Sequence, residues 1–381
     1  MADLATILDA AAAPFAAEIA LRTPEGTEVF EAHAHLGADE DGRSLDPATL
    51  LGWLDEAGAR RAVVFPLHDP ERVPAYRLPN DRVLAWAGES EGRFVPFCRL
   101  DPGDDPVREG ERCLELGARG IKLHPRAQSF AFADGVADDI FALAEQARVP
   151  LLIHAGRGMP PIADGLVELA LRHPGVVMIL AHAGIADQGV FASRLADHPG
   201  VLYDTSCFSA LDVLQLFARV PAERIVFASD PPYGRPFAGL YLVLRAAAAA
   251  GLDPSTLGLV VGGTIGGLVD GNGLPPASPP RTEDGFELSG RLGRVCMYGA
   301  MAFGMVIAGR PEHALEAIDL MAAATRDPDP AGVGETLERL GAALSAAAAL
   351  ARLEDGVWPA LGLVHMSMSL AATERAAENR R

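Results

Sequence analysis

The chain has 381 residues, of which 49% are hydrophobic and 22% charged, as expected for a globular protein with a large core. Its formal net charge of −19 would repel a phosphate backbone, so nucleic acid is excluded as an expected partner. The length suggests one large domain with an addition.

The opening segment, MADLATILDAAAAPFAAEIA, contains acidic residues and lacks the basic start of a signal peptide, so we expect an amphipathic helix. The most apolar later stretch, residues 295–309, is shorter than the roughly 20 residues that a membrane span needs. We therefore expect a buried helix there and no membrane association. The four cysteines are widely spaced and form no C-x-x-C motif, which favours reduced thiols in a cytoplasmic protein.

From residue 27 onward, short apolar runs alternate with longer segments of helical spacing. Continuous apolar runs indicate strands buried on both faces, as in parallel sheets. The predicted strands cover residues 28–35, 61–67, 93–100, 120–125, 150–156, 176–184, 201–206 and 224–230. Eight strand–helix units predict an α/β fold, the closed (β/α)8 or TIM barrel, with an open doubly wound sheet as the alternative.

The composition changes near residue 274, where GLPPASPPRTEDG has the Pro, Gly and Ser content of a linker. Beyond it, Ala- and Leu-rich stretches without strand signals predict roughly four helices. We expect a barrel with its N-terminal helix over residues 1–273, a linker over 274–284, and an added helical region over 285–381. These last helices could cover the barrel mouth, form a homo-oligomer interface or dock a partner protein.

Polar side chains end five of the predicted strands. The first strand ends in His33 and His35, which are two residues apart and so point to the same face. The others are Lys122 and His124 on the fourth strand, His154 on the fifth, His182 on the sixth and Asp230 on the eighth. In a barrel these strand ends converge on one mouth. Imidazoles and a carboxylate there suit a divalent transition metal such as zinc, which makes hydroxide available near neutral pH.

Cations follow several of these residues in the chain. Arg126, Arg157 and Arg235 come after the fourth, fifth and eighth strands, and Tyr233 also follows the eighth. In an acidic chain, local arginines at the mouth would attract an anionic substrate, and arginine suits carboxylate or phosphate. We therefore expect these residues, with Lys122 and His124, to contact a small carboxylated molecule. Tyr203, Asp204 and Thr205, which end the seventh strand, could also line the pocket, and weaker candidates are Phe65, His68 and Arg99.

The segments EAHAHLG, GIKLHP, LLIHAG, ILAHAG and VFASDPPYG, in this order and spacing, resemble the metal-dependent amidohydrolase superfamily. Residues 27–270 are most similar to its amidohydrolase-related branch, which includes aminocarboxymuconate semialdehyde decarboxylase. This resemblance implies one divalent metal, zinc or else manganese, held by His33, His35, His154 and Asp230. It also implies that His182 serves as acid/base or polarises the substrate, and that Asp230 accepts a proton from the metal-bound water. Glu31 stands where the family often has Asp.

Lys122 leaves a second version of the site open. In dihydroorotase-like and phosphotriesterase-like members, a strand-four lysine is carboxylated and bridges two metals, and the histidines matching His154 and His182 bind the second ion. The closer overall resemblance is to the one-metal branch, so we favour one metal.

Three functions remain open. The favoured one is a hydrolase that uses a metal-activated water on an amide, ester or lactone. The second is a metal-dependent, non-oxidative decarboxylase, which needs the same ligands and the same acid. The third is a non-catalytic barrel with an interaction tail. It is weakened because a purely structural zinc site is normally closed by four protein ligands, without an adjacent His and Lys.

Overall fold

The computed structural model describes residues 4–156, 162–207, 209–279, 290–326 and 334–378. Each predicted strand is present in these residues, and the third is divided in two. In chain order the parallel strands are β1 (Val29–Ala38), β3 (Ala59–Pro66), β4 (Phe94–Pro96), β5 (Cys98–Arg99), β6 (Ile121–Leu123), β7 (Leu151–Ile153), β8 (Met178–Leu180), β9 (Val201–Asp204) and β10 (Ile225–Val226). A short strand that was not predicted, β2 (Ser44–Leu45), pairs antiparallel with β1.

The strands form two hydrogen-bonded runs, β2-β1-β3-β4 and β10-β9-β8-β7-β6-β5. Backbone hydrogen bonds join these runs at both ends. The Phe97 amide, between β4 and β5, donates to the Val64 carbonyl at 2.8 Å, and the Ala32 amide of β1 donates to the Phe227 carbonyl at 3.0 Å. The first strand therefore meets the last, and the predicted (β/α)8 barrel is confirmed.

Alternate residues of the strands face inward and outward. On β7, Leu152 belongs to the apolar cluster inside the barrel, whereas Leu151 and Ile153 pack in the larger cluster beneath the helices. Burial on both faces explains the continuous apolar runs of the sequence. Ile265 and Val269, from the short helix α11 (Thr264–Val269), also belong to the inner cluster.

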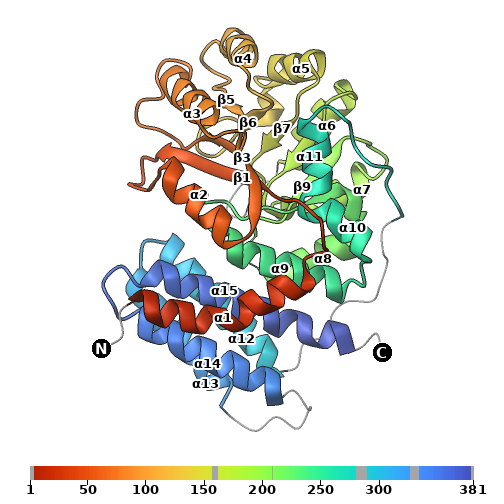
Figure 1. The fold of residues 1–381 in the computed structure, drawn as a ribbon. Coiled ribbons are helices and arrows are strands. Elements are labelled where there is room, and N and C mark those ends of the chain that lie inside the picture. Colours follow the sequence, from red (N-terminus) through yellow and green to blue (C-terminus); the bar gives the residue numbers. More distant parts are fainter. Residues whose placement is uncertain (1–3, 157–161, 208, 280–289, 327–333, 379–381) are drawn as a thin grey trace.

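Helices follow the strands and cover the outside of the barrel (Figure 1). They are α2 (Pro47–Glu56), α3 (Arg77–Glu89), α4 (Pro106–Glu115), α5 (Asp138–Ala147), α6 (Ala163–Arg172), α7 (Gln188–Arg194), α8 (Ala210–Arg219), α9 (Pro236–Ala249) and α10 (Pro254–Gly258). Local signals start several of them. Asp46 caps α2 by accepting a hydrogen bond from the Thr49 amide at 3.0 Å, and proline occupies the first turn of α2, α4 and α9.

The C-terminal region consists of α12 (Gly290–Ile307), α13 (Pro311–Ala324), α14 (Gly334–Leu350) and α15 (Val357–Glu378). α15 packs against α9, so this region lies against the barrel. The opening helix α1 (Leu4–Arg22) lies along the same helices (Figure 1). Of the predicted linker, only residues 274–279 are described, and the rest lies outside the described residues. Among the helices described, none combines the length and hydropathy needed to cross a bilayer.

Candidate active site

Three side chains converge at the carboxyl end of the barrel. His33 Nε2 lies 3.2 Å from His35 Nε2, and Asp230 Oδ1 lies 3.2 Å and 3.1 Å from these two atoms. Ligand atoms around a tetrahedral zinc, each 2.0–2.2 Å from the ion, are separated by about 3.3 Å. The observed spacing therefore suits one metal ion held by these three side chains.

Within this group, the Asp230 carboxylate gives the strongest indication of a bound cation. Its Oδ1 atom is buried and receives no well-oriented hydrogen bond from any described residue, although two imidazole nitrogens lie beside it. Buried carboxylate oxygens are normally hydrogen-bonded or bound to a cation. A metal ion at the centre of the three atoms would satisfy this oxygen.

The charge states of this group also suit a metal. Burial lowers the pKa of His35 to about 3, so its imidazole is neutral at pH 7. Burial alone would raise the pKa of Asp230, but the neighbouring His33 and His35 hold it well below its usual range. A neutral His35 and an ionised Asp230 are the forms that bind a divalent cation. Burial alone would lower the pKa of His33, but Asp230 and Asp204 raise it above its ordinary value, so His33 would release its proton on binding a metal.

Backbone contacts bring the two ends of the site together. The Asp230 amide donates to the His33 carbonyl at 3.1 Å, which ties the end of β1 to the residues after β10. Glu31, fully buried, accepts hydrogen bonds from the amides of His33 and Ser229 at 3.0 Å and 2.9 Å and from the Ser229 hydroxyl at 2.7 Å. Burial raises the pKa of Glu31 to about 8, against the opposing effect of these hydrogen bonds.

Asp204, at the end of β9, orients the first histidine. His33 Nδ1 donates to Asp204 Oδ2 at 2.7 Å, which leaves Nε2 free to bind a metal. Asp204 Oδ1 accepts from the His182 amide at 2.8 Å and from the Ser206 hydroxyl at 2.6 Å. From the sequence, Asp204 is expected to line the pocket, and a role in orienting His33 is not predicted. Asp204 is the last residue of β9, and this position at a strand end, which the other site residues share, could have indicated its role in the site.

A row of three histidines borders the three converging side chains. His182 Nδ1 donates to the Ser206 carbonyl at 2.7 Å, and His182 Nε2 lies 3.0 Å from His154 Nδ1. The His124 ring stacks on the His154 ring with centroids 3.7 Å apart. His154 is thus beside the convergent group but turned toward His182, and its role as a fourth metal ligand stays a prediction.

The backbone is strained at two residues of the site, His182 and Asp230. His182 and Asp230 have φ angles of 57° and 63°, in the left-handed region that residues other than glycine rarely adopt. Such conformations persist where surrounding contacts hold them, and they concentrate at functional sites.

Lys122 lies against the same group from β6. It is fully buried, with Nζ 3.4 Å from His33 Nε2 and 4.8 Å from the centre of the Phe65 ring. Burial lowers its pKa to about 7. This position suits both interpretations of Lys122, as a cationic clamp and as a carboxylated metal bridge, so the number of metals stays a prediction.

A cavity of about 780 Å³ opens above these residues. Three of the predicted substrate contacts line it, namely His124, Arg126 and Tyr233. Arg235 does not line this cavity. Its guanidinium stacks on the Trp53 ring at 3.8 Å and lines a smaller, adjoining cavity that shares wall residues such as Tyr233 and Trp358 with the first. Arg157, also predicted to contact substrate, lies outside the described residues. The cavity wall further includes Arg99, a weaker candidate from the sequence. Residues of α12 and α15 line it too, which agrees with one of the three roles left open for the C-terminal helices, that of covering the barrel mouth.

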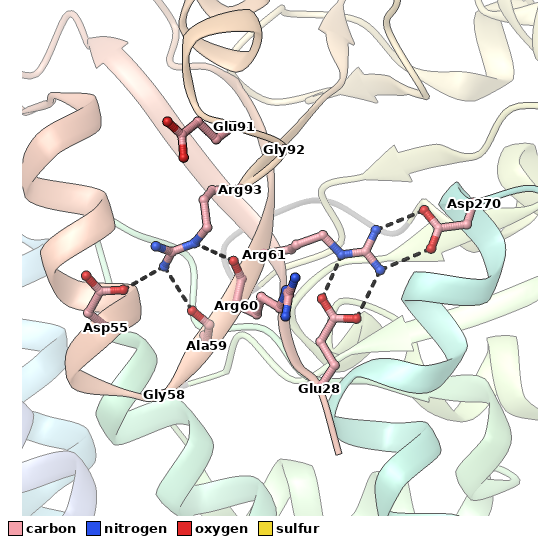
Figure 2. Close-up of a pocket in the computed structure, with 10 residues that line it drawn as sticks. All are labelled: Glu28, Asp55, Gly58, Ala59, Arg60, Arg61, Glu91, Gly92, Arg93 and Asp270. Carbon is pink, nitrogen blue, oxygen red and sulfur yellow. Dashed lines mark hydrogen bonds and ion pairs between the residues drawn. The ribbon is translucent and has the colours of Figure 1, made fainter. Parts of the chain in front are cut away.

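A second cavity, of about 840 Å³, lies at the opposite, amino-terminal end of the strands (Figure 2). Its charges are largely paired. Arg61 binds Glu28 at 2.7 Å and Asp270 at 2.9 Å, and Arg93 binds Asp55 at 2.7 Å. Conserved chemistry in barrel enzymes lies at the carboxyl end of the strands, whereas this end serves stability. We therefore assign the second cavity a structural role.

Comparisons with known proteins agree with this architecture. A family model described as Amidohydrolase matches residues 31–263, more than half of the chain. The apo structure of Metarhizium anisopliae IDCase is 14% identical, covers 64% of this chain and 97% of its own, and has a TM-score of 0.52. An amidohydrolase from Burkholderia multivorans with bound zinc is 16% identical, covers 65% and 100%, and has a TM-score of 0.50. At these identities the two structures show the fold. No curated protein matches the chain significantly.

Proposed function

Since the chain belongs to the amidohydrolase family, we propose that it is a metal-dependent hydrolase acting on an amide, ester or lactone of a small carboxylated molecule. The observation that carries this proposal is the convergence of His33, His35 and Asp230 at the base of a cavity. Such a site has protein ligands on one side and open space on the other, as catalytic metal sites do.

The residues present fit a divalent metal. His33, His35 and Asp230 would hold it, with His154 as the predicted fourth ligand. When bound, such a metal polarises a carbonyl oxygen and lowers the pKa of water to about 7. The zinc in the Burkholderia relative supports zinc as the first choice, with manganese as the alternative.

The chain's own residues supply proton transfer. Burial lowers the pKa of His182, so this imidazole is neutral at pH 7. Its Nδ1 hydrogen is held by the Ser206 carbonyl at 2.7 Å, so the lone pair lies on Nε2, which faces His154 Nδ1 at 3.0 Å and is the atom that would take a proton. The ionised Asp230 also lines the cavity and can accept a proton from water there.

The first test is metal content by elemental analysis, followed by a hydrolysis screen of amides, esters and lactones. We expect about one zinc or manganese per chain, and loss of metal and activity in the double variant H33A/H35A. His313→Ala, an exposed histidine on α13, is the matched control and should keep both.

Two results would contradict this proposal. One is unchanged metal content in the folded double variant, which would show that His33 and His35 do not bind the metal. The other is release of carbon dioxide without uptake of water, which would replace hydrolysis by the alternative decarboxylase reaction.

A further inference from the structure

Arg99 is a buried cation that faces the cavity without a matching acid. It lies on β5 in register with Lys122 of β6, is 1% exposed and lines the cavity wall. Its Nη1 donates to the Pro66 carbonyl at 3.3 Å. Its Nε and Nη2 atoms are buried and have no hydrogen-bond partner within the described part of the chain.

The acids of the cavity are occupied by other groups. Asp39 accepts hydrogen bonds from the Tyr233 hydroxyl at 3.1 Å and from the His68 amide at 3.2 Å. Asp41 forms an ion pair with Arg43 at 3.3 Å. Asp230 belongs to the group of three converging side chains. The Tyr76 ring, whose centre lies 5.2 Å from the guanidinium carbon, and the more distant charge of Asp39 offset the Arg99 charge in part. Among the described residues, no carboxylate forms an ion pair with Arg99.

The two free nitrogens of Arg99 form a specific pattern. The N–H bonds of Nε and Nη2 lie side by side on one edge of the planar guanidinium, and together they match the two oxygens of a carboxylate. Guanidinium stays charged even when burial lowers its pKa, and a buried charge without a partner is costly. A bound carboxylate would satisfy the charge and both donors at once.

The other side of the cavity is apolar and comes from the C-terminal helices. Phe303 and Val306 of α12 and Leu361 of α15 line it while being 6%, 7% and 2% exposed. Trp358 of α15 lines it too, and the Arg43 guanidinium, from the segment between β1 and β2, stacks on the Trp358 ring at 3.9 Å. These contacts make the added helices a wall of the cavity.

We propose that Arg99 binds the carboxylate of the substrate while α12 and α15 hold its hydrocarbon or aromatic part. The inference rests on the proposed function, because it assumes that the substrate binds in this cavity with its scissile bond beside His33, His35 and Asp230. It assigns the substrate to a class, small carboxylates with an apolar body, and it makes the C-terminal helical region a specificity element of the site.

Binding of simple probes tests this assignment without any turnover. Isothermal titration calorimetry on the full-length protein would compare 3-phenylpropionate with its uncharged amide and with propionate. The protein would be measured both as purified and after chelator treatment, since a carboxylate could otherwise bind the metal. We expect 3-phenylpropionate to bind roughly tenfold or more tightly than either comparison probe in both forms.

Variants then separate the two halves of the cavity. Arg99→Gln should weaken 3-phenylpropionate roughly 10- to 100-fold, and Arg99→Lys should recover part of the affinity. Arg60→Gln, an exposed arginine at the other end of the barrel, controls for net charge. Phe303→Ala should weaken 3-phenylpropionate but not propionate, whereas Met301→Ala, which is 43% exposed on α12, should change neither.

Several results would overturn the inference. Equal binding of the acid and the amide would exclude a carboxylate subsite, and this comparison uses only the unaltered protein. Unchanged affinity in a folded Arg99→Gln variant, or binding that disappears on chelation, would place the carboxylate elsewhere. Equal effects of Phe303→Ala on the binding of both acids would show that Phe303 does not contact the apolar part of the ligand. Failure of the proposed hydrolase function would show instead as missing metal or missing turnover, with probe binding to Arg99 intact.

Discussion

Asp204 Oδ2 accepts a hydrogen bond from His33 Nδ1 at 2.7 Å, across a separation of 171 residues in the chain. Both side chains are completely buried. The bond fixes the tautomer of His33 and turns its Nε2 atom toward His35 and Asp230. Carboxylates in this position raise the basicity of a metal-bound histidine and hold its ring in place.

Asp204→Asn should therefore weaken metal binding although Asp204 is not itself in the group of converging ligand atoms. The expected loss is about 10- to 100-fold in metal affinity, as for other groups that orient a ligand. Metal titration with a competing chelator measures it, and Asp197→Asn, an exposed acid before β9, is the control. Unaltered affinity in folded Asp204→Asn would show that packing alone orients His33.

Replacing Lys122 distinguishes one metal from two. With a single metal held by His33, His35 and Asp230, Lys122→Met should retain about one ion per chain, equal to the unaltered protein. Elemental analysis of both proteins after zinc loading gives the ratio. Two ions in the unaltered protein, falling to one or none in the variant, would instead support the carboxylated lysine.

Gly156 is close to two site histidines. A Cβ atom placed there would lie 3.0 Å from His182 Cδ2 and 3.1 Å from His154 Nε2. Gly156→Ala should therefore displace these rings by a few tenths of an ångström and lower turnover, with a stability loss of about 1 kcal/mol. Gly88→Ala on α3, where nothing lies within 4 Å of the added methyl group, should leave turnover unchanged and stability equal or higher. Kinetics and thermal unfolding of the two variants check this, and equal turnover in both would contradict it.

Glu18 of α1 couples the N-terminal helix to the barrel and to the C-terminal region. Its carboxylate binds Arg245 of α9 at 2.7 Å and Arg339 of α14 at 2.8 Å. Burial alone would raise the pKa of Glu18, but Arg245 and the other arginines lower it to about 2.

Because the folded pKa of Glu18 lies below its unfolded value of about 4.3, the stabilisation is complete above that pH and is lost as the pH falls toward 2. Glu18→Gln should thus cost about 2 kcal/mol at pH 7 and roughly half of that at pH 3. Denaturant unfolding at both pH values measures the difference, with the exposed Glu25→Gln as control. A cost independent of pH would mean that packing, and not charge, accounts for the role of Glu18.

Much of the barrel could be predicted because its signals are local. Apolar runs such as LLI in β7 follow from burial on both faces of a parallel strand. The polar residues that end the strands indicate a common mouth, since the carboxyl ends of barrel strands converge. For the same reason His33, His35 and Asp230 could be placed together from the sequence, although nearly 200 residues separate them.

Other parts of the site depend on side-chain directions and on long-range packing, which no local pattern encodes. Arg235 follows Asp230 closely in the chain, yet it turns away to stack on Trp53, whereas Arg99, on the short strand β5, faces the cavity. The apolar periodicity of α12 and α15 does not predict which helices or which cavity their apolar faces contact. The sequence by itself determined the barrel, the residue types of its candidate metal site and their common end. Only the tertiary structure decided how Asp204 orients His33 and how the C-terminal helices close the cavity, because both depend on contacts between segments far apart in the chain.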